Sequence, residues 1–360
     1  MTTRRGFLSG LLAAGLVPRP SWADAGAPRY LAAARGADGG SYLHGLSDMG
    51  EALFRLPLPA RGHAAAAHPM RPEAAAFARR PGRFALVIDC RSGAVMARLS
   101  APAGRHFYGH GAFSRDGARL FTAENDYDAA RGRIGVWDAA HGYARIGEFA
   151  SGGVGPHDIL RLPGTDVFAV ANGGIETHPD MGRVKLNLPT MRPNLSYLSA
   201  EGAMLDQVEL DPALRLNSIR HLAARPDGLI AFAMQWQGDV AAAPPVLALH
   251  RRGQAPAVLA APGDGVRAMR GYAGSVAFAG GGDAVAITSP KGGAVQIFSA
   301  AGAFAAQIDE PDICGLSACA GGLIATTGTG KALRILDGAP GRAVMHDAAW
   351  DNHLVGVGAG

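Results

Sequence analysis

Cysteine is scarce in this sequence, with three residues in a chain of 360. Cys314 and Cys319 lie on what reads as one strand and its turn, so roughly 16 Å of rise separates them. A disulfide requires Cα atoms within about 7 Å of each other. The sequence therefore predicts a fold that no disulfide framework holds together.

Charge and aromatic residues are also limited, at 18% and 7% of the chain, with a net charge of +4. No run of basic residues with interleaved aromatics occurs, which argues against nucleic acid as a partner. The sequence contains no GxSxG, HExxH or Walker-type phosphate loop, and these absences exclude the corresponding hydrolase, metalloprotease and nucleotidase signatures.

Long apolar runs are missing as well. The one candidate, Leu11 to Val17, is too short to cross a bilayer. It follows Arg4-Arg5, and the small residues Ala23-Asp24-Ala25 come after it, so residues 1–25 match a twin-arginine export signal with its cleavage site. We expect a periplasmic protein without a transmembrane segment in its mature chain, residues 26–360.

Glycine and proline, in contrast, are abundant, with 51 and 23 residues spread without a fixed period. Residues 109–138 show the unit that this spread reflects: a short apolar run headed by His110, a turn at Asp116-Gly117, and two further strands. Tight turns between short strands indicate antiparallel hairpins. In most units a glycine lies seven residues after the head, and the heads are His63, His110, His157, His221, Ser275, Cys314 and His353.

The heads recur about 40 to 60 residues apart, a repeat length that is typical of propeller blades. The last unit ends after its first strand, whereas three strands within residues 29–58 have no head of their own. The sequence therefore predicts an all-β, seven-bladed β-propeller whose last blade combines these N-terminal strands with the C-terminal inner strand. Such a closure leaves no free sheet edge between the first and last units.

Equivalent positions on the inner strands of a propeller surround its channel, so five histidines and Cys314 are expected at one mouth of that channel. Imidazole and thiolate are ligands of transition metals. We interpret the set as a metal site, for copper or iron rather than zinc. The alternative is that the histidines line a wet channel. The candidate ligands are His63, His110, His157, His221, His353 and Cys314.

Polar residues follow the second strand of several units and are expected on the same face as the heads. Exposed loops are polar in any protein, so few of these residues are informative. Glu124, Asn125, Asn172 and His178 adjoin blades with a head histidine, and we predict that they bind a cofactor or ligand over the channel.

The passages GHGAFSRDG, TAENDYDAARGRIGVWD, GVGPHD and ANGGIETHPDMGRVKLNLPTM resemble a bacterial family of exported proteins catalogued as domain of unknown function 1513. The resemblance covers the whole mature chain and implies a seven-bladed propeller with a twin-arginine signal, often encoded beside imelysin-type proteins that are linked to iron uptake. It implies no activity. The sequence also has a looser similarity to the propeller of nitrous oxide reductase, whose channel histidines bind a copper cluster. It shows no C-terminal cupredoxin domain of the kind found in that enzyme.

These observations favour a periplasmic, monomeric propeller that binds a transition metal and assists iron or copper acquisition alongside other periplasmic metal-uptake proteins. Two alternatives stay open: a hydrolase or oxidoreductase that uses the same site, and an interaction scaffold without metal.

Overall fold

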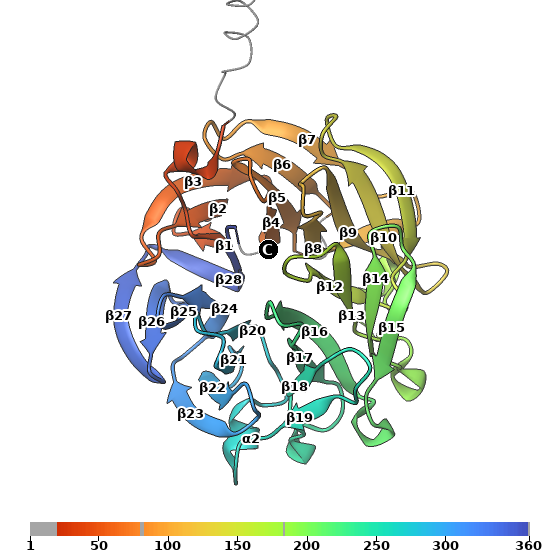
Figure 1. Cartoon of the computed structure of the whole chain (residues 1–360), viewed down its shortest axis with the longest axis vertical. Coiled ribbons are helices and arrows are strands. Elements are labelled where there is room, and N and C mark those ends of the chain that lie inside the picture. The colour runs from red at the N-terminus through yellow and green to blue at the C-terminus, as the bar shows by residue number, and fades with distance from the viewer. Residues whose placement is uncertain (1–19, 80–82, 183, 359–360) are drawn as a thin grey trace, which may run out of the picture.

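Seven four-stranded antiparallel sheets surround a central axis in the computed structural model of the chain, which is a seven-bladed β-propeller as predicted (Figure 1). The structure describes residues 20–79, 83–182 and 184–358. Most of the predicted export signal, residues 1–19, lies outside this range. No helix within the described ranges is long and apolar enough to cross a membrane.

Blades one to three follow the chain in order, each running from the axis to the rim. Blade one consists of β4 (Gly62–Ala67), β5 (Glu73–Ala78), β6 (Ala85–Asp89) and β7 (Val95–Leu99). Blade two consists of β8 (Arg105–Phe113), β9 (Arg119–Asp126), β10 (Arg131–Asp138) and β11 (Ala144–Ala150). Blade three consists of β12 (Pro156–Arg161), β13 (Val167–Asn172), β14 (Asn194–Ser199) and β15 (Met204–Glu209).

Blades four to six repeat the pattern. Blade four consists of β16 (Asn217–Ala224), β17 (Ile230–Trp236), β18 (Leu247–His250) and β19 (Ala257–Leu259). Blade five consists of β20 (Ser275–Phe278), β21 (Ala284–Ser289), β22 (Ala294–Ser299) and β23 (Phe304–Asp309). Blade six consists of β24 (Ile313–Cys319), β25 (Gly322–Thr327), β26 (Lys331–Leu336) and β27 (Ala339–Met345).

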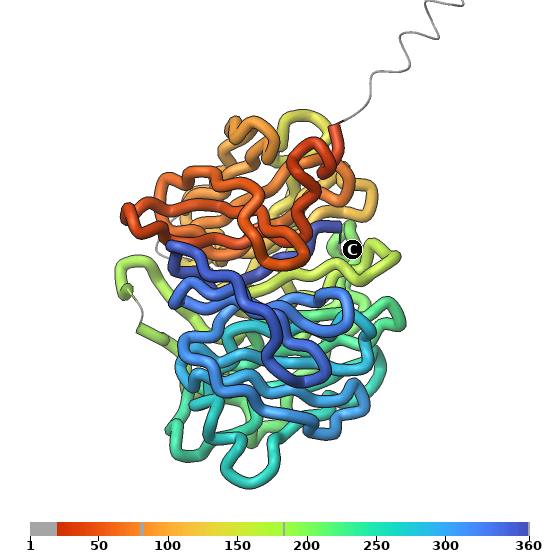
Figure 2. Tube along the Cα trace, turned by 90° about the vertical axis from the view of Figure 1, so that its left-hand side faces the viewer, coloured from red at the N-terminus to blue at the C-terminus, as the bar shows by residue number. Residues whose placement is uncertain are grey.

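Blade seven joins the two ends of the described chain, as the sequence predicts. Its order is β28 (Ala348–Gly356), β1 (Tyr30–Gly36), β2 (Ser41–Leu46) and β3 (Ala52–Leu58). The antiparallel pairing of β1 with β28 runs from Tyr30 opposite Gly356 to Gly36 opposite Ala348. Figure 2 shows the N-terminal strands beside the C-terminal strand. The ring is therefore closed by backbone pairing and without a disulfide among the described residues, where Cys90, Cys314 and Cys319 are free.

Short helices occupy the connections: η1 (Trp22–Ala25), η2 (Pro179–Met181), η3 (Leu188–Thr190), η4 (Pro212–Leu214), η5 (Val240–Ala242) and α2 (Gly265–Ala268). The predicted cleavage residues Ala23 to Ala25 lie in η1. Ala25 is buried, and the Trp22 indole N–H donates to the His68 carbonyl at 2.8 Å. Cleavage at this position stays a prediction, and the structure shows that it would remove the Trp22 contact.

Each blade packs face to face on its neighbours, which explains why the short middle strands are apolar along their whole length. All six residues of β5 are buried, whereas no residue of the rim strand β15 is. A strand that is covered on both faces carries no polar alternation, and a rim strand alternates because one face meets water. Aromatic rings fill the seams; Phe121 of blade two and Phe168 of blade three have ring centroids 4.5 Å apart.

Candidate metal centre

Five histidines from five blades converge on the axis of the propeller. Their rings meet mostly edge to face, with centroids 4.5 Å apart for His63 and His353, 4.5 Å for His110 and His353, and 4.8 Å for His157 and His221. The Nε2 atoms of His63 and His353 are 3.3 Å apart. Every predicted head lies on the innermost strand of its blade, and the five imidazoles form one compact group.

A β-bulge lies at the head of nearly every inner strand. The pairing of inner and second strands slips between Gly62 and Ala65 in blade one and between Phe107 and Gly111 in blade two. Corresponding shifts fall at His157, at Arg220 beside His221, at Cys314-Gly315, and at the segment of β28 that includes His353. Bulges redirect side chains and are frequent next to functional sites. Here they coincide with the convergence of the histidines on the axis.

Small residues around His110 make room for the close approach. Gly109 has a φ of +98°, and a Cβ at this position would lie 2.5 Å from Cδ2 of His63. Only glycine adopts this conformation readily and leaves the space empty. The Gly-His-Gly sequence at 109–111 therefore allows the His63 ring to lie against β8.

Oxygen atoms face the outward ring nitrogens of three of the five histidines. His110 Nδ1 is 3.1 Å from Asp158 Oδ1, and His63 Nδ1 is 3.6 Å from Asp351 Oδ1. His157 Nδ1 lies 3.1 Å from the carbonyl oxygen of Arg220. At His110 and His157 such a partner favours the proton on Nδ1 and leaves the Nε2 lone pair free, the usual arrangement around metal-bound histidine.

Several ring nitrogens of the cluster have no hydrogen-bond partner among the described residues. They are Nδ1 of His63, Nε2 of His110 and both ring nitrogens of His221, and all are buried. An unpaired buried polar atom is costly, so it calls for an explanation such as a missing ion. Both ring nitrogens of His44 are also unpaired, but His44 lies outside the axial group, edge-on to Trp350. The axial histidines differ from it because their rings converge.

Two overlapping triads have the spacing of a metal site. The ligand nitrogens of His63, His110 and His353 all lie within 4.8 Å of one another, and so do those of His110, His157 and His221. Three imidazoles around one ion leave further coordination positions open, which is the pattern of reactive rather than purely structural metal sites. The donor set and its geometry fit a transition-metal ion.

Burial keeps four of the five imidazoles neutral at physiological pH. It lowers the pKa of His63 to about 4, opposed in part by Asp351. Burial also holds the pKa of His157, His221 and His353 well below 6.5, and repulsion from neighbouring histidines acts in the same direction. Metal binding requires unprotonated imidazole, so these side chains present their lone pairs without prior loss of a proton.

Cavities adjoin the cluster on both faces of the propeller. One, of about 480 Å³, lies on the side of the loops between second and third strands and reaches His63, His157 and His221. The other, of about 820 Å³, lies on the side of the turns after the inner strands and reaches His110, His221 and His353. His221 borders both, so the histidines form a partition across the channel.

Cys314, predicted as a sixth ligand, is not brought to the cluster. Its Sγ lies 3.3 Å from the carbonyl oxygens of Thr326 and Asp351, and burial raises the pKa of the thiol to about 12. The side chain packs in the apolar seam between blades six and seven with Trp350. A thiol in this environment stays protonated, whereas metal binding requires the thiolate.

The four predicted rim residues occupy structural positions at some distance from the histidines. Glu124 is fully buried and accepts two hydrogen bonds from Arg145, at 2.7 and 3.0 Å. Asn125 donates to the Thr177 carbonyl.

Asn172 and His178 make similar local contacts. The Asn172 amide donates to Asn194 Oδ1 and Ser196 Oγ within blade three. His178 caps η2 and lies 3.3 Å from Asp128. None of the four rim residues lines the cavity over the histidines.

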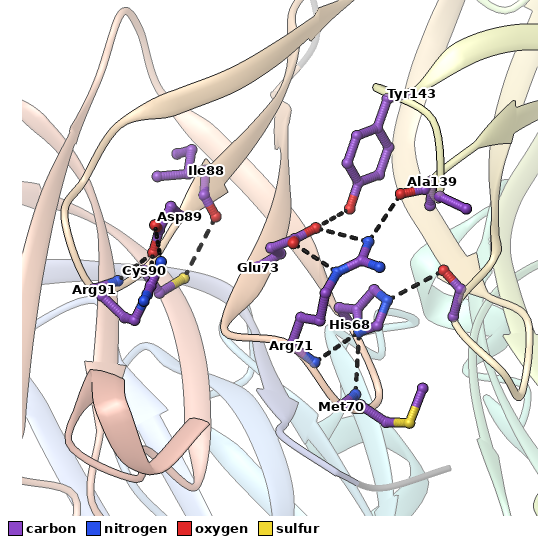
Figure 3. Close-up of polar contacts among 12 residues, drawn as sticks. His68, Met70, Arg71, Glu73, Ile88, Asp89, Cys90, Arg91, Ala139 and Tyr143 are labelled. Atoms are coloured by element: carbon purple, nitrogen blue, oxygen red, sulfur yellow. Dashed lines mark hydrogen bonds and ion pairs between the residues drawn. The ribbon is translucent and has the colours of Figure 1, made fainter. Parts of the chain in front are cut away.

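His68 shows what a structural histidine looks like in this fold (Figure 3). Its Nδ1 accepts from the backbone N–H groups of Met70 and Arg71, at 3.1 and 2.8 Å, and Nε2 donates to the Gly117 carbonyl at 3.1 Å. Beside it Arg71 pairs with Glu73 at 2.6 Å. Both ring nitrogens are satisfied, in contrast to His110 and His221.

Asp158 and Asp351 are the site residues that sequence reasoning missed. Asp158 directly follows His157 but serves His110 of the neighbouring blade, and it also accepts from the Leu222 N–H. Asp351 precedes His353 by two positions on β28 and also pairs with Arg61 and Arg79. A carboxylate beside a head histidine was the available signal, but its partner lies across a blade boundary.

The fold and the axial cluster together define a seven-bladed propeller with a histidine-lined centre. Residues 56–357 match the family model described as "Protein of unknown function (DUF1513)", and the chain belongs to this family. No curated protein matches the sequence.

Solved structures share the architecture at low sequence identity. Hydrazine synthase of Kuenenia stuttgartiensis superposes with a TM-score of 0.58 at 12% identity, over 85% of this chain and 89% of that one. Sqt1 of Saccharomyces cerevisiae gives 0.54 at 13%, over 80% and 86%. The Cps50 (Swd1) propeller domain of Myceliophteria thermophila gives 0.58 at 11%, over 83% and 90%. Likeness at this level establishes the fold alone.

Proposed function

We propose that this protein is a metal-binding β-propeller that holds one copper or iron ion at its axis. His63, His110 and His353 are the ligands of the preferred position, and His157 with His221 completes the overlapping one. The observation that carries the proposal is the arrangement of the cluster: Asp158 and the Arg220 carbonyl face Nδ1 of His110 and His157, the buried Nε2 of His110 has no partner, and the ligand nitrogens of each triad lie within 4.8 Å of one another.

The donor set favours certain metals. Imidazole suits copper, iron, nickel and zinc, and the Irving–Williams order places Cu²⁺ highest for a given nitrogen site. The protein supplies three converging imidazoles, and Asp351 and Asp158 lie beside Nδ1 of His63 and His110. When bound, the ion would supply an electrophilic or redox-active centre with open positions.

The setting of this function is also part of the proposal. The twin-arginine motif at residues 3–8 supports export to the periplasm, where the protein would act as an accessory to iron or copper acquisition. A protein that binds an ion through neutral side chains suits transient loading and release, because no thiolate has to be reprotonated when the ion leaves.

Metal content of the purified protein tests the proposal. We expect about one ion of copper or iron per chain after expression with export, and loss of that ion in the double variant His110→Ala/His353→Ala with an unchanged far-UV spectrum. The exposed His141, which pairs with Asp138 outside the cluster, is the matched control. Equal metal content in the cluster variant and in His141→Ala would refute the proposed ligands.

The cavity next to His63, His157 and His221 favours one second candidate, an oxidoreductase or hydrolase that uses the same ion. A pocket of about 480 Å³ beside open coordination positions has room for a small substrate. Turnover that disappears in His110→Ala/His353→Ala and returns on metal addition only to the wild type would support it. If the protein is metal-free and inactive, an interaction scaffold is the function that remains.

A further inference from the structure

The cavity on the loop side of the histidines is lined by several cationic side chains. Its charged lining residues are Arg79, Lys185, Arg220 and Lys291, and no Asp or Glu borders it within the described part of the chain. Converging charges of one sign around a concave site raise the local concentration of oppositely charged ligands. The cavity is therefore a candidate site for an anion.

Two of these cations have no ion-pair partner among the residues that the structure describes. Arg79 is compensated by Asp351 beneath it. Lys185 and Lys291 form no such pair, and both are exposed at the rim. The Lys291 ammonium lies 4.4 Å from the centre of the Tyr272 ring, which holds it at the edge of the cavity.

The cationic side chains of the cavity act on one another. Burial, followed by the charges of Arg220 and Lys291, lowers the pKa of Lys185. Arg270 adds another cation at the rim, since its guanidinium donates to the Lys291 carbonyl at 3.3 Å. An anion that bridged Lys185 and Lys291 would relieve this repulsion.

The remaining walls are suited to an organic ligand rather than a bare inorganic ion. Tyr108, Ile175, Trp236 and Tyr272 give the cavity an apolar and aromatic surface. Its volume of about 480 Å³ lies within the range of small-molecule sites, about 300–1,000 Å³, and far exceeds what one phosphate fills.

We propose that this cavity binds a small organic polyanion, a di- or tricarboxylate, through Lys185, Lys291 and Arg220. Because the same cavity reaches His63, His157 and His221, one carboxylate of the ligand would fill an open position on the ion; this part rests on the proposed metal site. The protein would then bind its metal together with a carboxylate ligand.

Calorimetric titration of the purified full chain with propane-1,2,3-tricarboxylate, a weak chelator, tests the inference. We expect binding that weakens at least tenfold in Lys185→Ala/Lys291→Ala and that falls as salt rises. Arg35→Ala/Arg98→Ala, which removes two exposed cations that do not line the cavity, should bind like the wild type. Equal affinity in both double variants, or absence of binding to the wild type, would overturn the inference.

Two further measurements test the organic nature of the ligand and distinguish failure of this inference from failure of the proposed metal site. Phosphate should bind much more weakly than the tricarboxylate, and equal affinity would overturn the assignment of an organic ligand. His110→Ala/His353→Ala leaves the cavity lining intact, so it should lose metal and the contribution of the ion but keep the tricarboxylate binding that depends on Lys185 and Lys291, whereas Lys185→Ala/Lys291→Ala should keep metal. A protein that binds metal but no tricarboxylate refutes only the inference, and the reverse result refutes only the proposed function.

Discussion

An ion held by His63, His110 and His353 would tie the closing strand β28 to blades one and two. These ligands lie on β4, β8 and β28, and β28 is joined to the N-terminal strands by backbone pairing with β1 and by apolar packing around Trp350 and Leu354. Opening of the ring at this seam would separate His353 from the other two ligands. We therefore predict that metal stabilises the protein, and that it protects the closure most.

The size of the effect follows from mass action. Free metal at 100 times its Kd adds about 2.7 kcal/mol to the free energy of unfolding. With roughly 340 folded residues and an unfolding entropy of about 2.1 cal/mol/K per residue, the entropy is about 0.7 kcal/mol/K. The expected rise in Tm is then about 4 °C.

Calorimetry and hydrogen exchange measure this prediction together. Copper at saturating concentration should raise the Tm of the wild type and of His141→Ala, and should leave His110→Ala/His353→Ala unchanged. Amides of β28 and β1 should gain more protection than those of β20 (Ser275–Phe278), whose blade contributes no histidine. An equal rise in the cluster variant, or protection spread evenly over all blades, would refute the reasoning.

Two further predictions concern other residues. Burial lowers the pKa of His68 to about 4, so the unfolded chain binds a proton below pH 6.5 that the native state rejects, and the stability from this residue is lost as pH falls from about 6.5 to 4. His68→Asn should reduce this loss by about 1–2 kcal/mol in denaturant unfolding at pH 7.5 and 4.5, and an unchanged difference would contradict it. Glu124→Ala leaves Arg145 without its main partner and should lower the free energy of unfolding by about 3 kcal/mol with metal content unchanged, whereas loss of metal at full stability would return Glu124 to the site.

The repeat and the closure of the ring could be predicted because both leave a local signature. The turn glycines Gly117, Gly164 and Gly228 have positive φ, a conformation that glycine adopts without cost, so their spacing records the blade period. The N-terminal strands have no head strand, and the C-terminal head at His353 has no strands after it. The two ends were therefore expected to complete one blade. Backbone chemistry of this kind is encoded within a few residues.

The convergence of the histidines could be predicted only as a ring of equivalent positions. How closely the side chains meet depends on the bulges at the heads, which shift the register between each inner strand and the strand that follows it, and on packing between blades. Cys314 illustrates the limit, because it too lies at a bulge, yet its side chain enters the seam with blade seven. A small apolar side chain gains more from burial there than a polar imidazole would.

The rim residues failed to reach the cavity for a related reason. Position in a blade fixes which face of the propeller a loop occupies, but hydrogen bonding decides which way the side chain turns. Glu124 turns toward Arg145, and Asn172 turns into a network with Ser151 and Asn194. Both are buried polar groups, which need partners within the fold before they are available to a ligand.

The seven blades are alike in backbone, and the candidate site depends on how their heads differ. Histidine occupies the heads of blade seven and blades one to four, which are consecutive in the ring, whereas blades five and six carry Ser275 and Cys314. A full ring of imidazoles would crowd the axis. On the side that the histidines leave open, the heads are a serine and a thiol that packs in the seam between blades six and seven. Because His221 borders the cavities on both faces, an ion at the axis is within reach of each. The difference between the heads therefore gives a fold of repeated blades an axial group of histidines that the cavities on both faces reach.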